Sequence, residues 1–529
     1  MRIILALLAA ILLVPRADAE IHEVNVTGGR VAGVSANGVV SFKGIPFAAP
    51  PVGELRWKAP QPVRPWTGVK QASTFGPSCM QDPNFVKIFG APPAISEDCL
   101  YLNVWTPAKA PGDALPVMVW IYGGGFVGGM TSIPAYDGTR LAEKGVVLVS
   151  VAYRLGVFGF LADPELSRES GKGISGNYGL EDQIAGLKWV KANIAKFGGD
   201  PSRVTIFGES AGGMSVSMLT VSPAAKGLFQ RAISESGGSL GPARLGNEGG
   251  ETVPPLKVAE AAGQKFLARL GANDIKAARA LSAEKIQTAL GPGLQGGFWP
   301  VYDGHILPSD AYELYQARRF NDTPVLVGTN SDEGALFVRG SVTPASFESQ
   351  IRAGYGKEAQ EILAAYPHAN DAEAAKSGKN IFRDATFAWH TWAWALLQSE
   401  KGHGKAFVYY FDHRTPQSPN GATHGAEIGY VFRNLGGPGG GPSGVAGPPR
   451  PEDVAMSDLM SSYWVNFAKN GDPNGSGLPE WPAFTADQQR VMYLGAHSGA
   501  QAVPNMEQVR ALDGYFAWRR EQEKAGLER

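Results

Sequence analysis

Short, nearly uninterrupted apolar runs recur along the chain and predict buried strands. The clearest of them are 115–122 (LPVMVWIY), 146–152 (VVLVSVA), 204–207 (VTIF) and 324–328 (PVLVG). Continuous rather than alternating apolarity is typical of strands that are covered on both faces, as in a largely parallel sheet. Between them, residues 180–194 place apolar side chains at three- and four-residue spacing, which predicts a helix. This alternation predicts an α/β fold with helices on both faces of a mostly parallel sheet.

The first nineteen residues have the pattern of a cleaved export signal. An apolar run at 3–14 follows an arginine and ends before Ala17-Asp18-Ala19, which fits a small-x-small cleavage site. The run is shorter than the ~20 residues that a membrane-spanning helix needs, and no later segment is long and apolar enough to span. We therefore expect residues 1–19 to be removed and 20–529 to form one domain, in the periplasm or outside the cell.

Composition narrows the class of protein further. The chain has 529 residues, of which 44% are hydrophobic, with 48 Lys plus Arg against 49 Asp plus Glu and a net charge of −1. High apolar content with little net charge excludes a disordered protein. The balance of charges lacks the basic excess expected of a nucleic-acid binder. The Gly- and Pro-rich segment 436–451 is expected to be a surface loop.

Two cysteines, Cys79 and Cys99, lie 20 positions apart in the expected mature chain. In an exported protein such a pair is most simply one disulfide. A metal site would need more ligands than this pair offers locally. The sequence therefore predicts a disulfide and gives no reason to expect a metal.

Two Gly-x-Ser-x-Gly strings are present, and their surroundings distinguish them. With 68 glycines in 529 residues, the pentapeptide alone is a weak signal. A nucleophile elbow needs a strand before the serine and a helix after it. The string 208–212 around Ser210 follows the apolar run 204–207 and precedes a helix-compatible segment, whereas Ser239 is followed by Pro242 and a Gly-rich stretch. Ser210 is therefore the expected nucleophile and Ser239 a loop serine.

A serine nucleophile needs a base, an acid that orients the base, and N–H donors for the oxyanion. The acid is expected to be Asp332 or Glu333, which follow the strand at 324–328, where open α/β sheets place their sites. The glycines 123–125 after the strand at 115–122 would let N–H groups approach a substrate oxygen. A phosphate cradle is less favoured, because no Gly-Lys-Ser/Thr follows. The pattern does not choose the base among the histidines downstream of Ser210, which are His305, His368, His390, His403, His413, His424 and His497.

Several long strings give the chain a specific resemblance. They are FKGIPFAAPPVGELRWKAPQP and SEDCLYLNVWTP near the start, WIYGGGF and GNYGLEDQIAGLKWVKANIAKFGGDPSRVTIFGESAGG in the middle, and TNSDEG, THGAEIGYVF and WVNFAKNGDPN towards the end. They cover nearly the whole mature chain and are far more specific than Gly-x-Ser-x-Gly. In them the chain resembles the type B carboxylesterases, the cholinesterase-like esterase and lipase family of the α/β-hydrolase fold.

The resemblance implies roles that the pattern alone leaves undecided. Ser210 would be the nucleophile, Glu333 the acid and His424 the base. The expected oxyanion donors are the N–H groups of Gly124, Gly125 and Ala211. The resemblance also implies two structural ion pairs, Arg56 with Glu97 and Arg154 with Asp182, and an acidic position beside the nucleophile at Glu209, whose role could be electrostatic or structural.

By the same resemblance the expected activity is hydrolysis of small-molecule carboxylic esters through an acyl-enzyme, with no metal or organic cofactor. The alternative within hydrolases is a lipase that acts on aggregated lipid. A non-catalytic adhesion protein is disfavoured, because Ser210, Glu333 and His424 are all present. Whether the protein is a monomer or a dimer stays open.

Substrate preference is expected to differ from that of choline-selective relatives. Those proteins carry a tryptophan in the Ω-loop that the Cys79–Cys99 disulfide would close, and its face binds quaternary ammonium. Here that loop has Phe85 and Phe89 but no tryptophan. Leu294 and Gly296 stand roughly where such relatives have phenylalanines that narrow the acyl pocket. The chain is therefore expected to accept bulky acyl groups without choline selectivity, in a pocket whose other candidate residues are Glu209, Trp299 and Phe337.

Overall fold

The structure is a computed structural model that describes residues 21–87, 93–243, 253–291, 298–436 and 447–527. The predicted export signal, Phe89, Leu294, Gly296 and most of the Gly- and Pro-rich segment lie outside the described residues. Among the described residues of that segment, Pro451 alone belongs to regular structure, as the first residue of a long helix.

The fold is built on an eleven-stranded sheet with the strand order β16-β15-β14-β13-β12-β11-β9-β10-β8-β4-β3. Neighbouring strands from β15 to β10 run parallel, and antiparallel pairs form both margins. The strands of this sheet are β3 (Val34–Ala36), β4 (Val39–Pro46), β8 (Tyr101–Thr106), β9 (Leu115–Ile121), β10 (Val147–Val151), β11 (Gly199–Glu209), β12 (Arg231–Glu235), β13 (Val325–Asn330), β14 (Ala406–Phe411), β15 (Arg490–Leu494) and β16 (Gly499–Ala502).

The four apolar runs all form strands of this sheet, at β9, β10, β11 and β13. The strand β11 is longer than its apolar run, because Gly199 already pairs with Leu115 before an irregularity that ends at Val204. Residues 199–203 are polar or helix-breaking, so this extension carries no apolar signal. Two smaller sheets contain β1 (Glu23–Val26), β2 (Gly29–Ala32) and β5 (Val69–Gln71), and β6 (Ser78–Cys79) and β7 (Ile95–Ser96).

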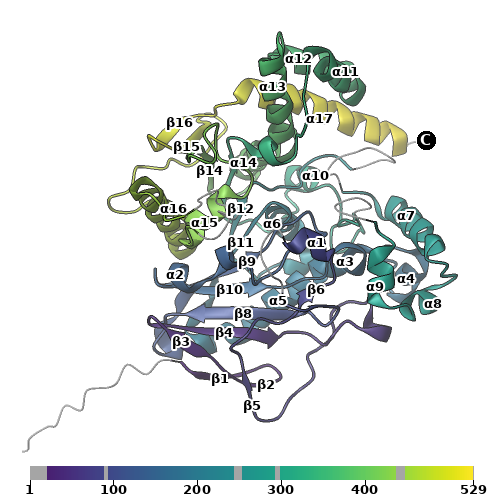
Figure 1. Ribbon diagram of the computed structural model, residues 1–529, viewed down its shortest axis with the longest axis vertical. Coiled ribbons are helices and arrows are strands. Elements are labelled where there is room, and N and C mark those ends of the chain that lie inside the picture. Colours follow the sequence, from purple (N-terminus) through teal and green to yellow (C-terminus); the bar gives the residue numbers. More distant parts are fainter. Residues whose placement is uncertain (1–20, 88–92, 244–252, 292–297, 437–446, 528–529) are drawn as a thin grey trace, which may run out of the picture.

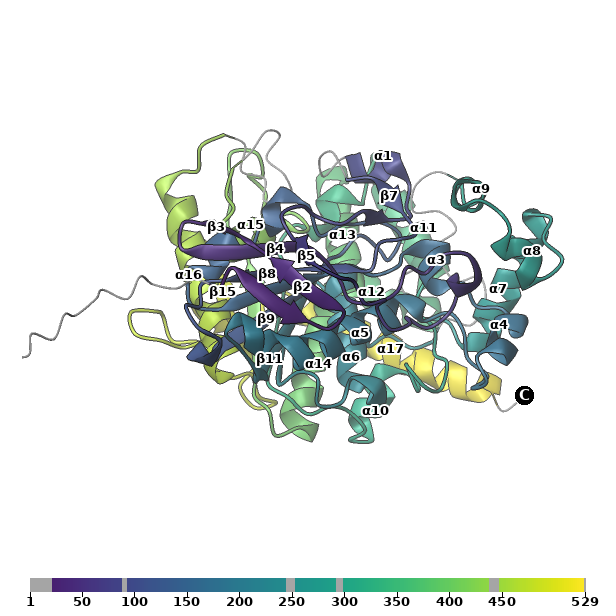
Figure 2. The same cartoon turned by 90° about the horizontal axis from the view of Figure 1, so that it is seen from below.

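Helices cover both faces of the large sheet, as the sequence predicted (Figure 1, Figure 2). The helices α5, α6 and α14 contact strands on one face, whereas α2 and α16 contact strands on the other. The α-helices are α1 (Pro83–Val86), α2 (Thr139–Ala142), α3 (Gly156–Phe160), α4 (Pro164–Glu169), α5 (Tyr178–Asn193), α6 (Ala211–Val221), α7 (Leu256–Arg269), α8 (Ile275–Arg279), α9 (Ala283–Thr288), α10 (Ala311–Gln316), α11 (Pro344–Gly354), α12 (Ala359–Ala365), α13 (Asp371–Arg383), α14 (Trp389–Lys401), α15 (Ala426–Phe432), α16 (Pro451–Asn470) and α17 (Met506–Leu527). The helix predicted at 180–194 is α5, which begins two residues earlier and passes into a 3₁₀ turn at Ile194.

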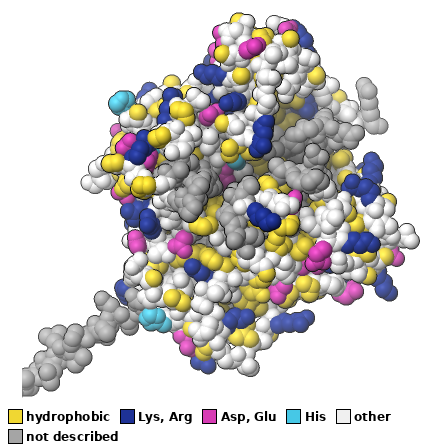
Figure 3. Space-filling model, viewed as in Figure 1, with side chains coloured by type: hydrophobic (Ala, Val, Ile, Leu, Met, Phe, Trp, Pro, Cys, Tyr) yellow, Lys and Arg dark blue, Asp and Glu magenta, His cyan; other side chains and the backbone are white. Residues whose placement is uncertain are grey.

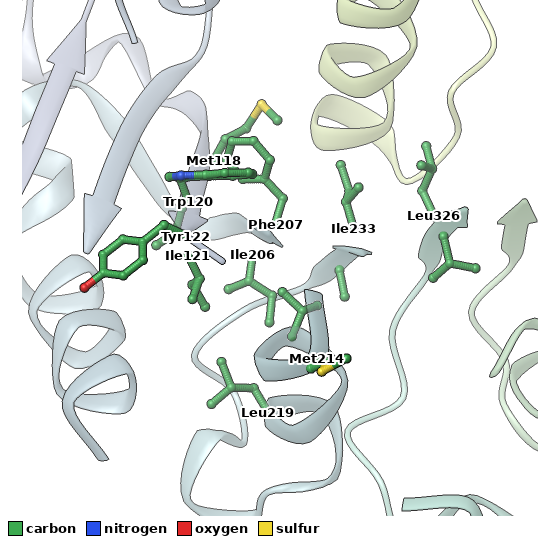
Figure 4. Close-up of a cluster of buried hydrophobic side chains, with 14 of the residues drawn as sticks. Met118, Trp120, Ile121, Tyr122, Ile206, Phe207, Met214, Leu219, Ile233 and Leu326 are labelled. Atoms are coloured by element: carbon green, nitrogen blue, oxygen red, sulfur yellow. The ribbon is translucent and has the colours of Figure 1, made fainter. Parts of the chain in front are cut away.

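The core of the sheet shows the two-residue alternation of strand side chains. Trp120 of β9 and Phe207 of β11 point to one face and pack against Phe432 of α15, with ring centroids 4.8–5.6 Å apart. Ile206 lies on the other face, toward Met214 of α6 (Figure 4). All five side chains are at most 2% exposed. Burying a large apolar side chain contributes about 1.5–3 kcal/mol, so both layers stabilise the strands that carry the site.

The predicted disulfide joins Cys79 and Cys99, and both cysteines are buried. Closing a loop of this length stabilises by roughly 3 kcal/mol in the chain-entropy treatment. The predicted ion pairs are also present. Arg56 Nη2 lies 2.6 Å from Glu97 Oε2, and Arg154 Nε lies 2.8 Å from Asp182 Oδ2.

The surface fits the near-neutral charge of the chain. On the face shown in Figure 3, acidic and basic side chains intermingle without a large patch of one sign. None of the described helices has both the length and the apolarity to cross a membrane.

Candidate active site

Ser210 stands in a sharp turn between β11 and α6. Its φ and ψ are 56° and −125°, a left-handed conformation that costs a non-glycine residue free energy and that recurs at functional sites. The turn also presses against β9, because a Cβ added at Gly208 or Gly212 would come within 2.5 or 2.0 Å of the Ile121 carbonyl oxygen. Only glycine fits at both positions. The Gly-x-Ser-x-Gly string of 208–212 thus forms a strand–turn–helix elbow, as predicted.

The second Gly-x-Ser-x-Gly string has a different structure. Ser239 lies in an irregular segment after β12, and no helix begins among the described residues up to 243. Its backbone N–H donates to Ser217 Oγ at 2.9 Å. This agrees with the prediction of a loop serine.

The predicted oxyanion donors come from two chain segments beside Ser210. Gly124 and Gly125 follow β9 with φ of 106° and 63°, and Ala211 is the first residue of α6. Within the described part of the chain, none of their three N–H groups donates to a backbone or side-chain acceptor. A Cβ at Gly123 would lie 2.9 Å from the Ser210 Cβ, so this glycine loop passes directly against the nucleophile. Free N–H groups in this position can bind an oxyanion.

The disulfide-closed loop supports the glycine loop. The Gln81 amide donates to the Gly129 carbonyl at 2.8 Å and accepts from the Gly129 N–H at 2.9 Å. Phe85 packs so closely on Gly128 that a Cβ there would lie 2.3 Å from its ring. Gly128 in turn donates to the Gly124 carbonyl at 3.1 Å. The loop between the two cysteines therefore holds the segment that carries two of the three oxyanion donors.

His424 and Glu333 form a buried pair. His424 Nδ1 lies 2.6 Å from Glu333 Oε2, and the other oxygen of Glu333 accepts from the Asn330 N–H at 2.8 Å. Glu333 is fully buried, whereas the neighbouring Asp332 is only partly buried and makes no hydrogen bond or ion pair with the imidazole within the described chain. Of the two acids that the pattern left open, the structure therefore brings Glu333 to the histidine.

The other buried histidines have different environments. His413 Nε2 contacts Asp453, a carboxylate that also pairs with Arg450. His390 Nδ1 accepts from the Leu240 N–H. Burial and then Arg520 lower the pKa of His390 to about 3, which keeps this ring neutral. Among the histidines of the described chain, only His424 contacts Glu333.

Glu209 lies on the opposite side of the imidazole from Glu333. His424 Nε2 is 3.0 Å from Glu209 Oε1, a close charge contact without the alignment of a hydrogen bond. No hydrogen bond joins Ser210 Oγ to His424 within the described residues. Hydrogen bonds of catalytic groups often tighten only when substrate binds. In the ligand-free arrangement the imidazole thus lies between two carboxylates.

These two carboxylates control the titration of the imidazole. Burial acts to lower the pKa of His424, but Glu209 and Glu333 outweigh it and raise the pKa to about 10. Burial raises the pKa of Glu209 to about 7, against the lowering effect of His424. The protonated imidazole is therefore favoured at neutral pH, and Glu209 shifts the formation of the neutral base to higher pH.

Aromatic rings fix the plane of His424. Phe387 stacks on the imidazole at 4.7 Å and 19°, and Phe337 meets it edge-on at 5.1 Å. Phe387 belongs to a π-helical turn, Asp384–Ala388, between α13 and α14. Such turns are frequent at functional sites. No sequence motif marked Phe387, because its position depends on the extra residue of this turn.

Further acids surround the pair and were also missed from sequence. The side chain of Asn330 donates to Glu427 Oε2, while its backbone N–H binds Glu333. Burial, Glu209 and Glu333 raise the pKa of Glu427 to about 8. Glu235, at the end of β12, is fully buried in the same cluster. Asn330 therefore connects Glu333 to a second layer of buried carboxyl groups.

Besides Glu209, two of the predicted pocket residues lie in the described part of the chain. Trp299 packs on Phe126 with ring centroids 5.3 Å apart, next to the glycine loop. Phe337 is 38% exposed and contacts His424, so it is accessible beside the base. Among the described residues, no group of three or more His, Cys, Asp or Glu is arranged to hold a metal ion.

Comparisons with known proteins agree with this arrangement. The sequence profile of the Carboxylesterase family matches residues 20–511. The chain is 38% identical over 489 residues to the fumonisin B1 esterase of Sphingopyxis macrogoltabida, covering 89% of this chain and 86% of that protein. It is 36% identical over 514 residues to the para-nitrobenzyl esterase of Bacillus subtilis, covering 93% and 98%.

Solved structures give the same result. A PNB esterase superimposes with a TM-score of 0.78 and is 35% identical in sequence. A carboxylesterase of Geobacillus stearothermophilus superimposes with a TM-score of 0.80 and is also 35% identical. Each alignment covers 93% of this chain and 99% of the other. The fold is that of the α/β-hydrolases. With a family profile over most of its length and esterases aligned across nine-tenths of it, the chain belongs to the carboxylesterase family and is a carboxylic ester hydrolase.

Proposed function

We propose that Ser210, His424 and Glu333 hydrolyse esters by two-step acyl transfer. The observation that carries this proposal is the 2.6 Å pair of His424 with buried Glu333, beside a serine in a strained strand–helix turn. In the first step His424 takes the Ser210 proton while the hydroxyl oxygen attacks the ester carbonyl. The imidazolium then protonates the leaving alcohol, and water repeats the sequence on the acyl-enzyme.

The oxyanion of each tetrahedral intermediate is bound by the N–H groups of Gly124, Gly125 and Ala211. These donors are fixed in the backbone before substrate arrives, so no reorganisation is needed when the charge develops. Ala211 adds the positive end of the α6 dipole. Glu333 keeps the imidazole proton on Nδ1, so that Nε2 is the basic nitrogen on the substrate side. It also stabilises the imidazolium that forms when Nε2 accepts a proton.

Glu209 sets the pH at which the base becomes available. Its carboxylate lies at the nitrogen that must accept the Ser210 proton, 3.0 Å from Nε2. Substrate binding therefore has to move Nε2 from Glu209 toward Ser210 Oγ. Glu209 acts on the reaction through His424 and is in this sense a positioning residue.

The substrate is proposed to be an ester with a bulky acyl group and without a choline leaving group. The sequence between Cys79 and Cys99 contains no tryptophan that could bind a quaternary ammonium ion. Two similar proteins are named as esterases of fumonisin B1 and of para-nitrobenzyl esters rather than of choline esters. Trp299 and Phe337 would supply apolar walls.

We also propose that the enzyme is exported with removal of residues 1–19. The sequence pattern of this segment supports it, as does the disulfide between Cys79 and Cys99. N-terminal sequencing of protein secreted by a bacterial host should begin at Glu20. An exported protein that still begins at Met1 would contradict the proposal.

Replacing Ser210 with Ala should abolish hydrolysis of p-nitrophenyl esters and labelling by an organophosphate, because no other nucleophile stands at the elbow. The expected loss in kcat/KM is on the order of 1,000-fold or more. Ser239→Ala is the matched control and should leave both readouts unchanged. Near wild-type labelling of Ser210→Ala would exclude Ser210 as the nucleophile.

Replacing Glu209 with Gln should move the acid limb of the kcat/KM profile to lower pH. Removing the negative charge destabilises the imidazolium, so the pKa of His424 falls and the neutral base forms at lower pH. An opposite charge as close to the imidazole as Glu209 shifts the pKa by about 1–3 pH units. The check is the profile of a neutral ester from pH 5 to about pH 11, corrected for uncatalysed hydrolysis, and an unmoved or raised midpoint would contradict the role of Glu209.

Butyryl and benzoyl esters should have a higher kcat/KM than acetyl esters of the same alcohol. Choline esters should gain nothing over neutral alkyl esters, because the sequence between Cys79 and Cys99 has no tryptophan to bind the ammonium group. Steady-state kinetics over a matrix of acyl and alcohol groups tests both statements. A strong preference for acetylcholine would overturn the proposed specificity, and a jump in rate above the critical micelle concentration would favour a lipase.

A further inference from the structure

Glu235 is a buried acid to which the proposed mechanism gives no role. It is the last residue of β12, and its side chain is fully buried. Its backbone carbonyl accepts from the Ser210 N–H at 2.9 Å, so it lies directly beneath the nucleophile turn. Its carboxyl group interacts electrostatically with Glu427 and Glu209, so it can influence the charge balance of the site.

The carboxyl group of Glu235 has too few hydrogen-bond donors around it to stabilise an ionised carboxylate. Oε1 accepts from Trp464 Nε1 on α16 at 2.7 Å, and Oε2 has no hydrogen-bond partner among the described residues. An ionised carboxylate offers about four acceptor sites and is buried only when it is paired or well hydrogen-bonded. One neutral indole N–H does not meet that need.

The groups that face Glu235 are acids. They are Glu209 of β11, Glu427 of α15, Tyr136 of the 3₁₀ turn before α2, and Tyr409 of β14. In the described chain no Lys or Arg forms an ion pair with Glu235, and the one basic group of the cluster, His424, already contacts Glu209 and Glu333. Burial, and then Glu427, raise the pKa of Glu235 well above its ordinary value.

We propose that Glu235 is a neutral carboxylic acid at neutral pH and serves as a positioning residue that adds no negative charge behind His424. Its carbonyl holds the Ser210 turn and its carboxyl oxygen holds Trp464. The proposal rests on the proposed function only in taking His424 as the base.

The neutrality of Glu235 matters because His424 already contacts two carboxylates. These raise the pKa of the imidazole to about 10. A third ionised carboxyl in the same buried cluster would stabilise the imidazolium further and move the neutral base to still higher pH. A protonated Glu235 keeps the shape of a glutamate and its hydrogen bond with Trp464 without raising the pKa of His424 further.

The test compares Glu235→Gln, which mimics a protonated carboxyl group, with Glu209→Gln, which removes a charge. The infrared difference spectrum of wild type minus Glu235→Gln at pH 7 should show the C=O stretch of a protonated carboxyl group. In the kcat/KM profile, the acid-limb midpoint of Glu235→Gln should stay within about 0.3 pH unit of wild type. The same limb of Glu209→Gln should fall by about one unit or more.

Carboxylate bands in place of the protonated band would overturn the proposal, and so would a downward shift of the Glu235→Gln midpoint comparable to that of Glu209→Gln. Glu235→Met, which is also neutral and similar in length, gives a second variant for the same comparison, and its acid-limb midpoint should likewise stay close to that of wild type. Gln should retain more thermal stability than Met, since it still accepts from Trp464. The infrared band is read without substrate, so its outcome is independent of whether Ser210→Ala abolishes hydrolysis.

Discussion

One buried imidazole between two carboxylates is the interaction around which the site is arranged. His424 contacts Glu333 through Nδ1 and Glu209 through Nε2. Each carboxylate stabilises the positive ring, and a base must be able to lose that proton. Any additional charge placed nearby would change the pH at which this happens. The rest of the cluster has to hold more acidic side chains in the same volume, which favours their neutral forms.

The sheet makes this arrangement possible by bringing distant residues to one edge. Glu209, Glu235 and Asn330 end three neighbouring parallel strands, β11, β12 and β13. Parallel strands end side by side, so groups that are far apart in sequence meet without long connecting loops. The cost is steric. The β11 turn lies so close to β9 that Gly208 and Gly212 cannot carry a Cβ, and Ser210 takes a strained backbone conformation.

Features with a local signal were predictable from sequence. Apolar runs marked β9, β10 and β13, and the strand–turn–helix context separated Ser210 from Ser239. The pairing of Glu333 with His424 has no local signal, since 91 positions separate them, and only the family resemblance selected it among seven histidines. Phe387, Asn330 and Glu235 were missed because their roles depend on a π-helical turn and on strand register, which no short pattern encodes. The start of β11 was missed because its residues are polar or helix-breaking.

The contact between Gln81 and Gly129 links the disulfide to the chemistry of the site. Gln81 and Phe85 lie between the two cysteines and pack against the loop that carries Gly124 and Gly125. Opening the Cys79–Cys99 bond would loosen the segment that supports the predicted oxyanion donors. Protein folded under reducing conditions is therefore expected to be a poorer catalyst even where it remains folded.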